Sequence, residues 1–131
     1  YLHNMRLLTL LFLCTSFSVM GQRFYDASGR LACRLDGERW YDASGSLLAR
    51  HSDDRLYAST GRLWARIEGD RMYTSSGSLI GRRSGERFYD ASGRLLGRFD
   101  GERFYDARGR LAGRVDQPSR RAAFWYFMVL K

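Results

Sequence analysis

Tyrosine and arginine recur at fixed spacing through most of the chain. From position 23 onward the sequence holds six copies of a 16-residue unit, and RFYDASGRLLGRFDGE at 87–102 represents them. Every copy has Tyr at its third position and Arg at its twelfth, which gives a ladder of Tyr25, Tyr41, Tyr57, Tyr73, Tyr89, Tyr105, Arg34, Arg50, Arg66, Arg82, Arg98 and Arg114. Aromatic rings stack on sugars, and guanidinium groups bind phosphate, sulfate or carboxylate. The ladder is therefore a candidate site for an anionic glycan or lipid headgroup. The alternative is that Arg–Tyr and Arg–Asp pairs only stabilise and solubilise an exposed sheet.

Residues suited to catalysis or metal binding are sparse within the copies. They hold no Ser/His/Asp set, no Cys/His pair and no Gly-rich phosphate loop. His51 stands alone, in a column that is otherwise apolar or Arg. Acidic residues recur in the turns, and turn capping explains them more simply than calcium binding does. The sequence predicts a protein that is not an enzyme, with no catalytic residue, metal or cofactor.

Two short extended runs separated by two turns make up each copy. In the fifth copy, Asp90 to Gly93 fits a type I turn capped by Asp, and Asp100-Gly101 fits a tight hairpin. The recurring Gly and turn residues interrupt every window long enough for a helix. The pattern predicts an all-β fold, an antiparallel meander of about twelve short strands.

Strand alternation assigns the fixed columns of each copy to two faces. The Asp-Gly turn favours a register in which Phe99 lies beside Phe104 and Arg98 beside Tyr105. The invariant leucines, such as Leu95, are expected to share the buried face with the aromatic second position. The Tyr and Arg ladder is expected on the opposite face.

The width of such a sheet decides how it is covered. Twelve strands at the usual spacing span about 55 Å, which favours strong twisting or coiling. We expect an open twisted sheet or a hairpin solenoid; curling into a sandwich or barrel, or pairing with a second copy, are alternatives. His51 and Arg83 replace an apolar residue at the thirteenth position, so we expect the array to bend or be more exposed there.

The two ends of the chain depart from the repeat, which occupies residues 22–118. Residues 1–21 fit a helical signal peptide that starts at Met5, carries Arg6 before an apolar stretch and is cleaved after Gly21. Residues 119–131 combine basic and aromatic residues, and we expect a C-terminal strand that caps the last edge of the array. The alternative is contact with a membrane or partner through Trp125, Tyr126 and Phe127.

The recurring YDASGRL strings resemble the YD-type repeats of large secreted bacterial toxins and adhesins, over residues 23–118. The paired aromatic Phe88-Tyr89 and the turn Gly93 are more loosely similar to the hairpin repeats of choline-binding wall proteins. The chain as a whole resembles small exported bacterial hairpin-repeat proteins of unassigned function. These resemblances imply an exported β-hairpin array and transfer no catalytic residue.

Charge and composition narrow the class of partner. The formal net charge is +8, but the acidic residues lie among the arginines of the repeats, which argues against nucleic acid. We expect an exported, non-enzymatic structural or protein-interaction protein, in the periplasm or at the outer membrane or cell surface. Its partner would be itself or another envelope protein. The alternative is a binding module for an anionic envelope glycan or lipid.

Overall fold

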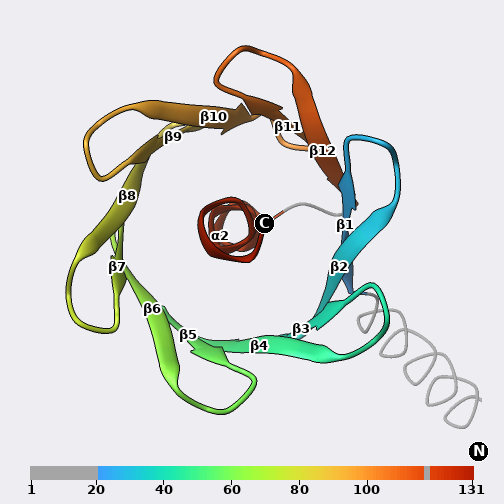
Figure 1. Ribbon diagram of the computed structural model, residues 1–131, viewed down its shortest axis with the longest axis vertical. Helices are drawn as coiled ribbons and strands as arrows, with labels where there is room; N and C mark the ends of the chain where they lie inside the picture. Colours follow the sequence, from blue (N-terminus) through green and yellow to red (C-terminus); the bar gives the residue numbers. More distant parts are fainter. Residues whose placement is uncertain (1–20, 117–118) are drawn as a thin grey trace, which may run out of the picture.

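The computed structural model describes residues 21–116 and 119–131 and shows a closed barrel around a helix (Figure 1). The expected signal peptide falls on residues outside the described part, apart from Gly21. Twelve antiparallel strands follow one another around the barrel in chain order. The strands are β1 (Gln22–Asp26), β2 (Leu31–Asp36), β3 (Arg39–Asp42), β4 (Leu47–Ser52), β5 (Arg55–Ala58), β6 (Leu63–Glu68), β7 (Arg71–Thr74), β8 (Leu79–Ser84), β9 (Arg87–Asp90), β10 (Leu95–Phe99), β11 (Arg103–Asp106) and β12 (Leu111–Asp116).

The expectation of an open twisted sheet or a solenoid is wrong, because the last strand pairs with the first. Phe24 of β1 lies opposite Val115 of β12 in an antiparallel ladder. Closure leaves no sheet edge with unpaired N–H and C=O groups, which is the physical advantage of a barrel over an open sheet. The all-β class and the six hairpins are confirmed.

The turns between the strands of each repeat have the predicted chemistry and flare outward from the barrel wall (Figure 1). In the turn between β9 and β10, the Oδ1 atom of Asp90 accepts hydrogen bonds from Ser92 N at 2.9 Å, Ser92 Oγ at 2.7 Å and Arg94 N at 2.9 Å. Gly93 has a φ of 88°, which favours glycine. We call these six turns the petals.

The register predicted across the tight turn is confirmed, but the expected place of the invariant leucines is wrong. Arg98 pairs with Tyr105, and Phe99 pairs with Phe104. On the other side of β10 a β-bulge intervenes, so that Leu95 lies opposite outward-facing Tyr89. The extra residue reverses the alternation, and Leu95 is 36% exposed instead of buried. The same bulge occurs in all six hairpins.

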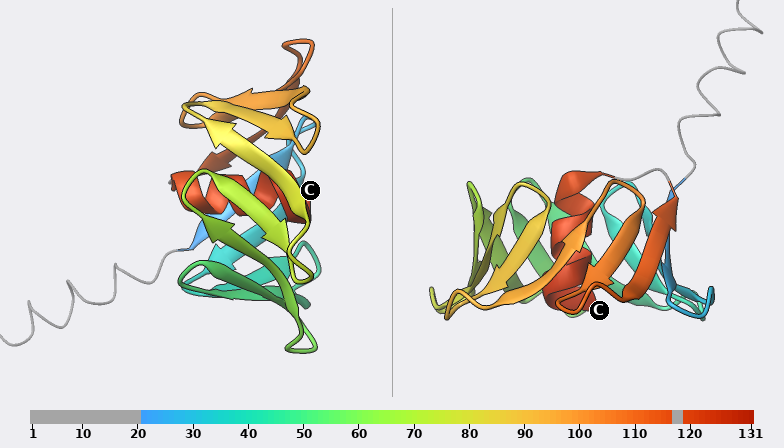
Figure 2. Two further views of the ribbon diagram at one scale, coloured as in Figure 1. Left: turned by 90° about the vertical axis from the view of Figure 1, so that its left-hand side faces the viewer. Right: turned by 90° about the horizontal axis from the view of Figure 1, so that it is seen from above.

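The C-terminal segment is helical, so the expectation of a capping strand is also wrong. It comprises the α-helix α2 (Arg120–Trp125) and the π-helical η2 (Tyr126–Leu130), and it runs through the barrel (Figures 1 and 2). Ser119 caps its start, because its Oγ accepts a hydrogen bond from Ala122 N at 3.3 Å. A helix satisfies its backbone groups internally, which suits a segment enclosed by apolar side chains.

The core of the molecule lies between the inner wall and this central helix. Phe24 stacks on Tyr126 with ring centroids 4.6 Å apart, and Phe88 stacks on Phe127 at 4.8 Å. Trp125 is fully buried. Strand and helix side chains form one hydrophobic cluster. The central helix therefore covers the apolar inner wall of the barrel, as one sheet of a β-sandwich covers the other.

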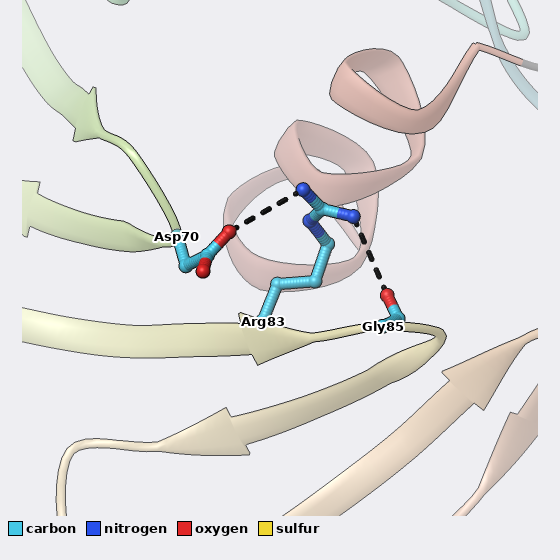
Figure 3. Close-up of polar contacts among 3 residues, drawn as sticks. All are labelled: Asp70, Arg83 and Gly85. Carbon is cyan, nitrogen blue, oxygen red and sulfur yellow. Dashed lines mark hydrogen bonds and ion pairs between the residues drawn. The ribbon is translucent and has the colours of Figure 1, made fainter.

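The barrel keeps its register at the two positions where a bend or greater exposure was expected. His51 accepts a hydrogen bond on Nδ1 from Trp40 Nε1 at 3.1 Å, which gives the half-buried imidazole a partner. The half-buried Arg83 reaches the rim, where it lies 3.5 Å from Asp70 and donates to the carbonyl of Gly85 at 3.4 Å (Figure 3). Both polar residues are accommodated locally, without a break in the sheet.

Candidate functional site

Arginine and tyrosine of the sequence-predicted ladder meet in pairs on the outer wall of the barrel. Each arginine at the twelfth repeat position lies over the ring of the tyrosine on the next strand. The distance from the guanidinium carbon to the ring centroid is 4.5 Å for Arg34–Tyr41, 4.8 Å for Arg50–Tyr57, 4.8 Å for Arg66–Tyr73, 4.6 Å for Arg82–Tyr89, 4.2 Å for Arg98–Tyr105 and 4.3 Å for Arg114–Tyr25. The sixth pair joins β12 to β1. The structure therefore brings all twelve residues into a closed ring, which we call the Arg–Tyr belt.

Local folding explains why these pairs form. The tight turn between β10 and β11 places Arg98 directly opposite Tyr105, and both side chains face outward. A planar guanidinium stacks on an aromatic face, and at an exposed site such a contact contributes about 0.5–1 kcal/mol. The belt follows from a register that every tight turn repeats.

A second row of arginines lies beside the belt, and the candidate set predicted from the sequence did not include it. The opening arginine of each repeat is exposed and pairs with the belt arginine of the same hairpin, as Arg87 does with Arg98. These opening arginines are Arg23, Arg39, Arg55, Arg71, Arg87 and Arg103. Their invariance was the sequence feature that could have identified them. Like charges opposite each other on a sheet are destabilising unless counter-charges compensate them.

Acidic residues provide this counter-charge in part of the ring. Arg34 pairs with Asp36 and Arg66 with Glu68, in each case two residues along the same strand. Arg114 pairs in the same way with Asp116 at 3.0 Å. The fourteenth repeat position therefore neutralises belt arginines on β2, β6 and β12.

Petal carboxylates serve as turn caps. The pKa values of Asp26, Asp42 and Asp90 lie below the ordinary value, mainly because a serine hydroxyl two residues later donates to each carboxylate. The pKa of Asp106 is lowered mainly by the backbone N–H of Arg110. No group of three or more His, Cys, Asp or Glu residues suited to a metal ion occurs in residues 21–116 and 119–131.

The two residues most suited to acid–base or nucleophilic chemistry are engaged in the core. Burial lowers the pKa of His51, against the opposing charge of Glu38, so its hydrogen bond with Trp40 is made by the neutral ring. Burial raises the pKa of the Cys33 thiol to about 12. A thiol with that pKa is protonated at neutral pH and is a poor nucleophile.

The aromatic residues predicted to contact a membrane or partner lie inside the barrel. Trp125 and Tyr126 are buried, and half-buried Phe127 packs on Phe88. Neither helical segment in the described part of the chain is long and apolar enough to cross a membrane. These three residues fill the core.

A small pocket opens at the rim beside Arg83. It has a volume of about 190 Å³, and its lining includes the charged residues Arg83, Arg120 and Asp100 and the aromatic residues Phe88 and Phe99. Figure 3 shows that Arg83 is already engaged at this rim by Asp70 and by the carbonyl of Gly85. This pocket is confined to the rim beside Arg83, whereas the Arg–Tyr belt extends around the whole barrel.

These features define a class of protein: a closed ring of β-hairpins with flared turns and a central helix. The chain belongs to the 5-fold beta-flower protein family, whose family model matches residues 21–131. This chain carries six hairpins. The match supports a small β-repeat protein, and the family is not a known enzyme family. Comparison with curated proteins and with solved structures found no match.

Proposed function

We propose that the chain is a non-enzymatic interaction protein of the bacterial envelope that works through its outer wall. The observation that carries the proposal is the filled interior. Trp125 and Phe124 of the central helix are buried against the strands, so the inner wall is already occupied by the chain itself. The surface left for a partner is the outside, where the same side chains recur around the ring.

Photo-crosslinking in expressing bacteria tests this proposal. A photoreactive residue at outward-facing Leu95 is expected to form adducts with another envelope protein or with a second copy, identified by mass spectrometry. The control replaces buried Phe88, where adducts are expected only within the chain. The absence of intermolecular adducts at Leu95 and at the equivalent Leu47 and Leu111 would contradict the proposal.

Export is part of the proposed function. Strand β1 begins at Gln22, so cleavage after Gly21 would leave every strand of the barrel intact. The test is N-terminal sequencing of the chain recovered from the periplasm of an expressing bacterium. We expect the mature protein to begin at Gln22. An uncleaved chain that stays in the cytoplasm would contradict export.

A second candidate function is the binding of an anionic envelope glycan or lipid headgroup by the Arg–Tyr belt. The specific observation in its favour is the pairing of like charges, as between Arg87 and Arg98, on a chain of net charge +8. An anion bound between such arginines would relieve their repulsion.

Salt dependence tests the second candidate. Binding of long-chain polyphosphate or anionic vesicles should weaken steeply with salt, because exposed charges are screened. It should also weaken when belt tyrosines such as Tyr57 and Tyr89 are replaced by Leu. Binding that is insensitive to both changes would contradict a role of the belt.

A further inference from the structure

Two of the six hairpins differ from the others on the outer wall. At the fourteenth repeat position, β4 has Ser52 and β8 has Ser84, where the other four repeats have an acidic residue: Asp36, Glu68, Asp100 and Asp116. The belt arginines of these two strands, Arg50 and Arg82, form no ion pair among the described residues. This contrasts with Arg34, Arg66 and Arg114, which pair with the acid two residues along.

Arg98 on β10 also forms no ion pair in the described part of the chain, since Asp100 accepts hydrogen bonds from the backbone N–H groups of Glu102 and Arg103. The pKa of Asp100 is nevertheless lowered, first by the N–H of Arg103 and also by the charge of Arg98, so this belt arginine still has an acid close by.

Strand pairing then gathers three arginines around each serine. Arg50 lies opposite Arg39 on β3, and Ser52 lies opposite Arg55 on β5. The three arginine side chains are exposed, and Ser52 is half-buried, opposite Arg55 and two residues along the strand from Arg50. We call Arg39, Arg50, Arg55 and Ser52 the first cluster.

The second cluster repeats this arrangement. Arg82 lies opposite Arg71 on β7, and Ser84 lies opposite Arg87 on β9. All four residues are exposed. The recurrence of three arginines and a serine at the same four repeat positions indicates a built feature of the wall.

Two of the acids closest in sequence to the clusters are engaged elsewhere. Asp54, which precedes Arg55, lies 2.7 Å from Arg121 at the start of the central helix. Asp70, which precedes Arg71, lies 3.5 Å from Arg83 (Figure 3). Glu38 and Glu86 occupy the rim turns beside Arg39 and Arg87, as acids do in other repeats. Asp53 directly follows Ser52, whereas Gly85 follows Ser84. The surplus of positive charge is therefore larger at the second cluster than at the first.

The petals of these two repeats show a matching change. Their eighth position is Ser46 or Ser78, whereas the other repeats have arginine there: Arg30, Arg62, Arg94 and Arg110. Both repeats therefore lose a positive charge at the petal and a negative charge on the wall. The effect is to concentrate positive charge at the clusters without raising the net charge of the repeat.

Stacking on a tyrosine ring orients one arginine of each cluster. Arg50 lies over Tyr57 at 4.8 Å, and Arg82 lies over Tyr89 at 4.6 Å. A guanidinium stacked by its face keeps its N–H donors at the edge, where they match the oxygen atoms of a phosphate group. We propose that the two clusters are phosphate-binding sites for a phosphate-bearing polymer, a proposal that rests on the second candidate function of the outer wall.

The placement of the clusters favours a polymer over a lipid surface. They lie two hairpins apart in a closed ring of six, so they face different directions around the wall. A flat bilayer meets one cluster at a time, whereas a flexible chain that carries several phosphates can reach both. Simultaneous contact raises the overall affinity through effective concentration.

Titration calorimetry of the full chain with tripolyphosphate and with long-chain polyphosphate tests the proposal. The informative variant is S52D/S84D, which gives these two repeats an acidic residue at the fourteenth position, as the other four repeats have. We expect it to weaken binding of both probes at least about tenfold. The matched control is S46D/S78D, which makes the same chemical change in the same two repeats but at the petals, and it should change affinity less than about twofold.

The possible results separate the inference from the proposed function. If S52D/S84D and S46D/S78D weaken polyphosphate binding equally, the clusters are not sites, while general binding by the belt stands. If the wild-type chain binds neither polyphosphate nor phosphatidylglycerol vesicles even at low salt, both proposals fail. Binding to phosphatidylglycerol vesicles that S52D/S84D abolishes, without binding of polyphosphate, would overturn the polymer in favour of a lipid surface. Circular dichroism verifies that each variant is folded.

Discussion

The inner and outer walls of the barrel are built from the same strands, yet their residues vary very differently. The inward second position of the repeat holds four residue types, in the order Phe24, Trp40, Leu56, Met72, Phe88 and Phe104. Four outward columns are constant: arginine at the first and twelfth positions, tyrosine at the third and leucine at the ninth. The outward fourteenth position varies between an acid and serine. The difference follows from symmetry, because a ring of six similar hairpins surrounds one helix that has no such symmetry.

Each inner position therefore faces a different part of the helix. A Cβ atom added at Gly97 would clash with the carbonyl oxygen of Tyr105 on the next strand and would lie 2.7 Å from the ring of Phe127. The equivalent position in the second repeat is Ala49, which is fully buried. Close packing allows little freedom in such places. The constancy of these four outward columns has no comparable origin in filling space, which is why we assign the interaction surface to the outer wall.

Removal of the central helix is expected to have the largest effect. Deletion of residues 119–131 takes Phe124, Trp125 and Tyr126 out of the core and exposes the inner wall to water. We expect the truncated chain to lose cooperative thermal unfolding, followed by circular dichroism, and to aggregate. A truncated chain with an unchanged melting midpoint would show that the barrel does not depend on its helix.

The two walls can be compared directly with tryptophan substitutions. Trp125→Ala, in the core, should lower the free energy of unfolding by about 3–5 kcal/mol. Trp64→Ala, at an outer site where the side chain is 39% exposed, should change it by less than about 1 kcal/mol. Urea denaturation measures both. Trp125→Phe is the conservative control and should cost less than Trp125→Ala, because the indole N–H has no hydrogen-bond partner among the described residues.

Sequence patterns predicted the hairpins, the petals and the belt because these depend on local turn chemistry. Asp90 and Gly93 specify their turn without help from distant residues, and the Asp-Gly turn fixes Arg98 against Tyr105. The bulge that moves Leu95 outward was missed, because the extra residue is Ala32, Leu48, Trp64, Ile80, Leu96 or Ala112 and has no turn-forming preference.

Closure and the central helix could not be read from local patterns. The pairing of Phe24 with Val115 joins residues at opposite ends of the array. The tail has nine consecutive apolar residues without helical periodicity, from Ala122 to Leu130, because a helix enclosed on every side needs no polar face. Both features depend on the tertiary structure as a whole.

Belt substitutions should have a moderate effect on stability. Tyr89→Leu removes one exposed Arg–Tyr contact and should cost about 0.5–1 kcal/mol. Tyr25→Leu removes the pair that joins β12 to β1, and we expect a similar cost because backbone pairing and the core hold the closure. Urea denaturation of the two variants side by side is the measurement. A much larger loss for Tyr25→Leu would show that closure depends on the belt.

The smallest effect is expected at the petals and should depend on pH. The lowered pKa values of Asp26, Asp42 and Asp90 mean that their caps stabilise the fold above the unfolded carboxyl pKa of about 3.9 and lose this contribution as the pH falls through the folded values. Ala58 stands where these repeats have Asp. Ala58→Asp should therefore raise the melting midpoint at neutral pH and not at strongly acidic pH. An equal shift at both pH values would contradict the capping account.

The central claim is that the outer wall carries two phosphate sites, created where serine replaces an acid. Titration calorimetry with tripolyphosphate counts these sites in three forms of the chain. We predict two sites in the wild type, no site of comparable affinity in S52D/S84D and three in D116S. Asp116 lies 3.0 Å from Arg114, and its loss frees a third cluster with Arg103 and Arg23. The same number of sites in all three forms would contradict the claim.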